Sequence, residues 1–148
     1  MTPTLAQYYK RTPIIQPQST HFNPTKNIYA RTITMLIDRD QQRNNVSYAQ
    51  KKGTVQVIEL AFITINFNQL PKEVIEEICH TNTPFGTLLE KHQIKILTQN
   101  RTYFTTACTP EIALFMPCEL NKVVYGRKNT IIRADNKQWL AHVMEILP

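Results

Sequence analysis

The chain ends in two runs with the alternation of a β-strand, residues 124–133 and 139–147. A period of two places every second side chain on the same face of a strand. A polar turn at Asp135-Asn136 separates the runs, which predicts an antiparallel hairpin. Two earlier runs, from Ile28 and from Thr54, are rich in β-branched residues and flank a long polar segment. The chain is thereby constrained to build an antiparallel sheet.

Helical segments are expected between these strands. Residues 70–82 carry apolar side chains at helical spacing, and Thr83 followed by Pro84 predicts a helix with threonine as its N-cap and proline at its first position. Residues 93–107 predict another strand or bent strand pair, and residues 109–117 a short helix. This order predicts an α+β domain with an antiparallel β-sheet and helices packed on one face.

The length of 148 residues fits one domain with a core of its own. Residues 1–27 contain four prolines and show no periodicity, so they predict an N-terminal extended arm over the domain, or a partly disordered lead. The domain proper then covers residues 28–148. No segment has the run of apolar residues that a membrane span or a secretory signal needs.

Charge narrows the class of partner. The chain has 17 Lys and Arg against 11 Asp and Glu, a net charge of +6, which attracts anions such as nucleic acid, a membrane surface or a small anionic metabolite. The basic residues are scattered and never form a block longer than a pair. Nucleic-acid grooves usually show a denser basic stripe interleaved with aromatics, so a small-molecule partner is favoured.

The cysteines and histidines point to no metal or redox centre. Cys79, Cys108 and Cys118 form no C-x-x-C pair, and their odd number argues against a disulfide framework. They are expected to be reduced core thiols in a reducing compartment, which predicts a cytoplasmic location. The four histidines have no metal-ligand or nucleophile spacing. These residues therefore predict no metal site.

Glu145 interrupts the last apolar run, and its neighbours on both sides are apolar. A buried ionised carboxylate is costly unless it is paired, so Glu145 either emerges into water or faces a cavity. The apolar surroundings favour the cavity. A turn at residues 135–136 sets Gly126 opposite Glu145, where the missing side chain leaves space for a ligand. Alternation places Glu145 on one face with Trp139, Ala141, Val143 and Leu147.

Three further positions are candidate binding residues. The helix start around Phe85 and Gly86 presents backbone N–H groups to which an anion could come close, although most such helix starts bind only water. Arg31 opens the first strand, where a solvated arginine is the alternative interpretation. Arg127 and Lys128 could be ordinary surface charges.

These stretches, in this order, resemble the chorismate lyase family, whose members share a fold with the ligand-binding UTRA domains of some bacterial regulators. The resemblance covers about residues 28–148 and rests on YARTITML, TPFGTLL, YGRKNTI and the terminal MEILP. The corresponding family patterns are an arginine-led strand, T-P-L-G-x-x-L, an aromatic-Gly-Arg strand and a T-E-x-F/L-L-P ending.

The resemblance implies a cofactor-independent lyase that converts chorismate to 4-hydroxybenzoate and pyruvate, a step of quinone biosynthesis in the cytoplasm or, for a chain of plastid origin, the stroma. Arg31 would bind the ring carboxylate together with the backbone N–H of Phe85. Glu145 would lie near the ring oxygen, so that Arg31 and Glu145 are the catalytic residues. The substrate-binding set implied in this way is Arg31, Phe85, Gly86, Gly126 and Glu145.

The sequence also departs from the family. Residues 1–27 lack the D-x-S-[ML]-T type motif that covers the product, Phe85 replaces the usual leucine, and the stretch between TPFG and YGR is longer than in the short bacterial enzymes. The missing motif favours a second hypothesis, a non-catalytic domain that binds a small aromatic or carboxylated ligand. A third is a nucleic-acid-binding adaptor. The oligomeric state stays open.

Overall fold

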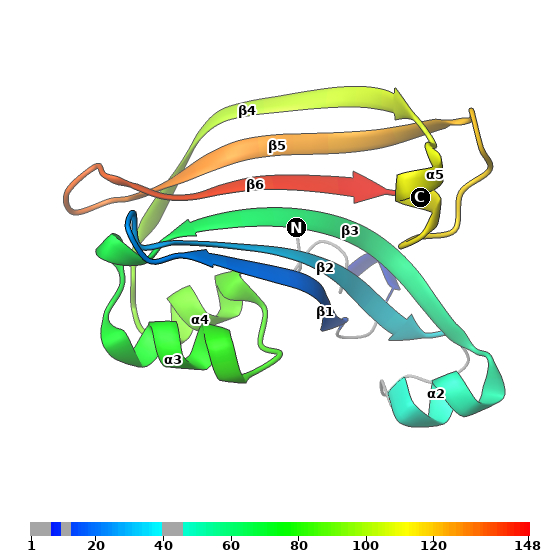
Figure 1. Cartoon of the computed structure of the whole chain (residues 1–148), viewed down its shortest axis with the longest axis horizontal. Coiled ribbons are helices and arrows are strands. Elements are labelled where there is room, and N and C mark those ends of the chain that lie inside the picture. Colours follow the sequence, from blue (N-terminus) through cyan, green and yellow to red (C-terminus); the bar gives the residue numbers. More distant parts are fainter. Residues whose placement is uncertain (1–6, 10–12, 40–45) are drawn as a thin grey trace.

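The structure, a computed structural model, describes residues 7–9, 13–39 and 46–148. Its centre is one antiparallel sheet of six strands in the order β1-β2-β3-β6-β5-β4 (Figure 1). The predicted α+β class with an antiparallel sheet is confirmed. The strands are β1 (Ile14–Asn23), β2 (Ile28–Asp38), β3 (Val55–Asn66), β4 (Ile96–Ala107), β5 (Val123–Arg133) and β6 (Trp139–Leu147).

Two helices, α3 (Lys72–His80) and α4 (Phe85–Lys91), lie on one face of the sheet (Figure 1). Their apolar sides join a core cluster with β2, β3 and β6, in which Leu88 and Leu140 are fully buried. We call this covered side the inner face. The remaining helical turns lie at strand ends: α2 (Val46–Lys52), η1 (Phe67–Gln69) and α5 (Pro110–Ala113).

The helices α4 and α5 begin close to the residues predicted from the sequence, and α4 is shifted by one residue. Thr109 caps α5, and its side chain accepts a hydrogen bond from the backbone N–H of Ile112. Helix α4 begins one residue later than predicted, because Pro84 rather than Thr83 holds the N-cap position and no side chain caps the helix. Proline fixes its own φ, which suits the turn into a helix whether it stands at the cap or just inside.

The predicted N-terminal arm contributes a strand to the sheet. Strand β1 pairs antiparallel with β2 along its length, from Ile14 opposite Leu36 to Asn23 opposite Ile28. The predicted domain boundary at residues 27 and 28 therefore falls inside the β1–β2 hairpin. Residues 1–6 and 10–12 of the predicted arm, and residues 40–45 of the long polar loop, lie outside the described residues.

A β-bulge changes the register of the closing hairpin. Ile132 pairs with Trp139, as the predicted turn requires, but Ile131 pairs with Ala141, so Leu140 is an extra residue in β6. Past the bulge every partner moves by one position. Trp139 is also displaced from the face predicted for it, and its ring stacks on His142 at 4.7 Å between centroids.

The prediction of reduced core cysteines is wrong. Cys108 and Cys118 form a disulfide, with their Cα atoms 6.0 Å apart, and Cys79 is exposed. The loop after β4 folds back on itself through hydrogen bonds between Cys108 and residues 121 and 122, which the spacing in sequence does not reveal. These cysteines therefore do not support the predicted reducing compartment. Within the described ranges, no helix is long and apolar enough to cross a membrane.

Candidate functional site

A cavity of about 380 Å³ lies between the inner face of the sheet and α4. Strands β2, β3, β4, β5 and β6 supply its floor and walls, and α4 with the preceding Pro84 supplies its cover. Four of the five predicted binding residues line it, although they come from distant parts of the chain: Arg31, Phe85, Gly86 and Glu145. Whether these residues bind a ligand stays a prediction.

Arg31 lies in β2 with only 3% of its surface exposed, so the alternative of a solvated arginine is wrong. Its Nη1 donates to the carbonyl oxygen of Ile78, at the end of α3, over 3.4 Å. Its Nε and Nη2 are buried and have no hydrogen-bond partner. Burial lowers the pKa of the guanidinium, and the nearby Tyr29 offsets part of that effect. Arg31 is therefore a buried cation with two unused donors toward a cavity.

Glu145 is 8% exposed and has a partner within the protein. Both Nε and Nη2 of Arg127 donate to its Oε2, at 2.9 and 2.7 Å. The Arg127 side chain is itself only 16% exposed, so this residue is not an ordinary surface charge. The ion pair gives a reason for the buried carboxylate that needs no ligand, although both side chains also line the cavity.

Gly126 does not lie opposite Glu145, and the prediction that it opens the cavity is wrong. The bulge at Leu140 moves the partner of Glu145 to Arg127 and sets Gly126 against Ile146. Gly126 faces away from the cavity, where a Cβ atom would overlap the Phe104 ring. Its missing side chain makes room for that ring and does not serve a ligand.

Glu59 is the site residue that the sequence reasoning missed. It lies in β3, is 1% exposed, and its Oε2 is buried without a hydrogen-bond partner. Burial, together with the charge on Glu145, raises the pKa of Glu59 to about 8. The signal was present, because Glu59 is a single carboxylate within the apolar run of residues 54–67, the same pattern that singled out Glu145.

The unpaired polar atoms of the described inner face converge on this cavity. Besides Arg31 Nε and Nη2 and Glu59 Oε2, the Oδ1 atom of Asn129 in β5 is buried without a partner, and all three residues line the cavity. Buried polar groups in native proteins are nearly always hydrogen-bonded, so a cluster of unpaired ones needs a cause. A bound ligand that supplies the missing partners is such a cause.

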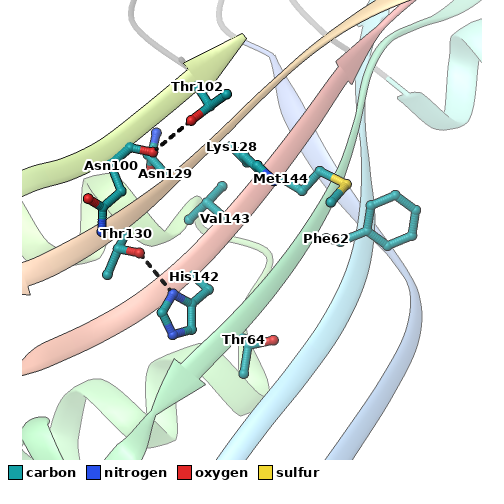
Figure 2. A pocket seen from close by; sticks show the side chains of 10 residues that line it. All are labelled: Phe62, Thr64, Asn100, Thr102, Lys128, Asn129, Thr130, His142, Val143 and Met144. Carbon is teal, nitrogen blue, oxygen red and sulfur yellow. Dashed lines mark hydrogen bonds between the residues drawn. The ribbon is translucent and has the colours of Figure 1, made fainter. Parts of the chain in front are cut away.

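The opposite, outer face of the sheet carries an open hollow of about 400 Å³ (Figure 2). Phe62 and Met144 form one part of it, and Thr130 with His142 another, joined by a 3.0 Å hydrogen bond between Oγ1 and Nδ1. Its polar side chains are bonded to each other or reach solvent, apart from Asn129, which borders both hollows. No group of three or more metal-binding side chains occurs in the part of the chain that the structure describes.

In sequence, no protein-family model and no curated protein matches the chain. In structure, it is similar to PhnF from Mycobacterium smegmatis, with a TM-score of 0.67 at 7% identity over 97% of this chain and 61% of PhnF. It is also similar to the ligand-binding domain of a proposed GntR-family transcriptional regulator from Bordetella bronchiseptica, with a TM-score of 0.63 at 8% identity over 92% of this chain and 85% of that one.

A GntR-family transcriptional regulator from Enterococcus faecalis V583 gives a TM-score of 0.56 at 14% identity, over 90% of this chain and 91% of that one. Identities this low show the fold and nothing more about activity. The part of the predicted resemblance that these comparisons carry is the fold: this chain has a UTRA/chorismate lyase-like fold, similar to that of the ligand-binding domain from Bordetella bronchiseptica and to PhnF.

Proposed function

We propose that this domain binds a small molecule with an anionic group in the inner cavity, and that Arg31 holds the anion. The observation that carries the proposal is the set of unpaired buried atoms on Arg31, Glu59 and Asn129, three residues that line one cavity. A concave, mostly apolar pocket with a few converging polar groups is the usual form of a small-molecule site.

The chemistry of Arg31 favours a carboxylate or a similar oxyanion. Its Nε and Nη2 are adjacent donors of one planar guanidinium, and this pair matches the two oxygens of a carboxylate. Because Arg31 is buried, the ligand replaces no strong hydration at that position, and the charge-assisted bonds retain much of their strength. Apolar side chains such as Ile33 and Ala61, between the Arg31 and Glu59 positions, favour a hydrophobic or aromatic body.

Titration of the protein with benzoate and 4-hydroxybenzoate tests this proposal. A ligand that binds only the folded state raises the melting temperature, and calorimetry gives its affinity. We expect Arg31→Gln to weaken binding by about a hundredfold, because the loss of one partner of a buried charge pair costs several kcal/mol. Lys128→Gln, on the outer face of β5, is the matched control and should change affinity by less than about twofold.

Absence of both heat and a thermal shift at millimolar concentrations of these acids would contradict the proposal. Equal affinities of wild type and Arg31→Gln would contradict the assignment of Arg31 while leaving ligand binding in place. The two outcomes are distinct because the first is an absence of binding by the wild type, whereas the second requires that the wild type binds.

Chorismate lyase activity is the second candidate. One observation favours it: Arg31, Glu145 and the proton-holding carboxyl of Glu59 line the same cavity. Elimination of pyruvate needs a bound anion and a side chain that donates a proton near the departing ether oxygen, which is general acid catalysis. Glu145 is held by Arg127, so Glu59 is the better placed of the two carboxyls to carry that proton.

Incubation with chorismate, followed by chromatography for 4-hydroxybenzoate, decides between the two candidates. If the protein is a lyase, Glu59→Gln should lower turnover by about a hundredfold or more, and Arg31→Lys should raise KM first. Binding of 4-hydroxybenzoate without any turnover of chorismate would leave the binding domain as the function.

A further inference from the structure

Two buried ionisable groups, the Arg31 guanidinium and the Glu59 carboxyl, have polar atoms without a partner in the inner cavity. Arg31 has two unbonded donors, and Glu59 has an unbonded oxygen. The Glu145 carboxylate does not complete either of them, because Arg127 donates twice to it. The other charged side chains of the cavity wall are Glu90 on α4 and Arg101 on β4. Buried polar groups are stable only when they are bonded, so the cavity lacks a negative group for Arg31 and a hydrogen-bond donor for Glu59.

Arg31 and Glu59 are separated along the sheet. Arg31 pairs with Ile63 across the β2–β3 ladder, and Glu59 stands four residues before Ile63 on the same strand. At about 3.3 Å for each residue of a strand, this places the two backbone positions roughly 13 Å apart along the sheet. Since both side chains line the space between them, a ligand that meets both ends must be elongated.

The Glu59 end calls for a donor. Glu59 Oε2 is a buried oxygen without a partner, whereas an ammonium offers three N–H donors. A neutral hydrogen bond to the ligand would need no carboxylate at position 59, because glutamine can supply one without the cost of burying an acid next to Glu145. What a carboxylate adds is charge.

We infer that the ligand is a zwitterion, an anion that binds Arg31 and carries at its other end a protonated amine that binds Glu59. This inference rests on the proposed function. On binding, the amine displaces the Glu59 proton to solvent and pairs with the carboxylate, and the anionic group pairs with Arg31, so that each end of the ligand meets a charge of opposite sign.

A matched pair of probes tests the inference: 4-(aminomethyl)benzoate, which has a carboxylate and an ammonium across an aromatic ring, and 4-(hydroxymethyl)benzoate, in which a neutral hydroxyl replaces the amine. At pH 7.5 we expect the amine to bind about tenfold tighter or better, because it completes a charge pair that the hydroxyl cannot. Benzoate serves as the reference for the carboxylate end alone.

The pH dependence supplies a second readout on the wild type. Glu59 has a pKa of about 8 in the unliganded protein, so an ammonium must displace its proton on binding. Affinity for 4-(aminomethyl)benzoate should therefore rise by close to tenfold for each pH unit between about 6 and 7. Calorimetry at pH 6.5 in two buffers of different ionisation enthalpy should show release of about one proton. The hydroxymethyl probe should show neither effect.

Glu59→Gln should reduce the preference for the amine over the hydroxyl to within about threefold and abolish the proton release. Glu76→Gln, an exposed carboxylate on α3, is the matched control and should keep both. Equal or tighter binding of the hydroxyl probe, or proton uptake with the amine, overturns this inference while benzoate still binds. If none of the three acids binds, the proposed function fails, and the inference fails with it.

Discussion

The two faces of the central sheet carry hollows of nearly equal volume, about 380 Å³ inside and 400 Å³ outside, and they differ in chemistry. The inner hollow is lined by buried groups with unused hydrogen-bonding capacity on Arg31 and Glu59. In the outer hollow, His142 stacks on Trp139 and bonds to Thr130, and Phe62 and Met144 are 37% and 38% exposed (Figure 2).

This difference shows that volume by itself does not identify a binding site. Apart from Asn129, which borders both hollows, the outer groups can be satisfied by water or by one another, so they gain little from a ligand. The inner groups are removed from water, and their unmet hydrogen bonds are a cost that a ligand can relieve. Arg127 and Lys128 are neighbours in β5, and Arg127 lines the inner hollow while Lys128 lines the outer one. Single substitutions at these two positions can therefore test the difference between the faces.

The largest effect is expected from filling the inner cavity. Ala61 lines it from β3, and Ala61→Phe places a ring in the space that a ligand would occupy. Affinity for benzoate should fall by about a hundredfold or more, which exceeds the effect of losing one contact. Thr64→Phe, on the outer face of the same strand, should leave affinity within about twofold. Calorimetry measures both, and equal losses would contradict the assignment of the site to the inner face.

The next effect concerns stability. Arg127→Gln removes the partner of a buried carboxylate and leaves Glu145 close to Glu59. Removing one member of a buried pair costs about 3 kcal/mol, whereas Lys128→Gln at the adjacent outer position should cost about 0.5 kcal/mol or less. Urea denaturation at pH 7 gives the two free energies of unfolding. Similar values would mean that the Arg127 ion pair is no more protected from solvent than Lys128.

Glu59 makes stability depend on pH. Its pKa rises from 4.5 to about 8 on folding, so the folded state holds the proton more tightly than the unfolded chain. The associated stability is present below about pH 4.5 and is lost as pH rises toward 8. Glu59→Gln should therefore raise the melting temperature relative to wild type by a few degrees at pH 8 and by less at pH 5.

A difference in melting temperature that does not change between these two pH values would contradict the protonated state of Glu59. Glu76→Gln, at an exposed position, is the control in which little dependence on pH is expected.

The smallest effect is expected on the outer face. His142→Ala removes the stack on Trp139 and the hydrogen bond to Thr130, both at the protein surface. The cost should be about 1 kcal/mol or less, since such aromatic contacts contribute little beyond their buried area. Affinity for benzoate should not change. A loss of affinity above about threefold would show that the two faces are coupled through β6.

Strand alternation was enough to predict the antiparallel sheet, helical spacing was enough to predict α3, and the Thr83-Pro84 start was enough to predict α4 to within one residue. Arg31 and Glu145 were correctly placed around one space, because a charged residue inside an apolar run must be accounted for by its surroundings. The same reasoning applied to Glu59 would have found the third charged residue. The partner of Glu145, Arg127, could not have been found this way, since a lone carboxylate in a strand does not reveal whether a neighbouring strand offers a cation.

Tertiary structure decided the rest, and the closing hairpin shows why. The turn at residues 135–136 is a local feature, and the register that it predicts holds as far as Ile132 and Trp139. One bulged residue, Leu140, then shifts every later pair, so that Arg127 instead of Gly126 meets Glu145. Local sequence determines the period of a strand and the charges it carries. Register depends on packing across the whole sheet, and a shift of one residue exchanges the faces and the partners of every side chain beyond it.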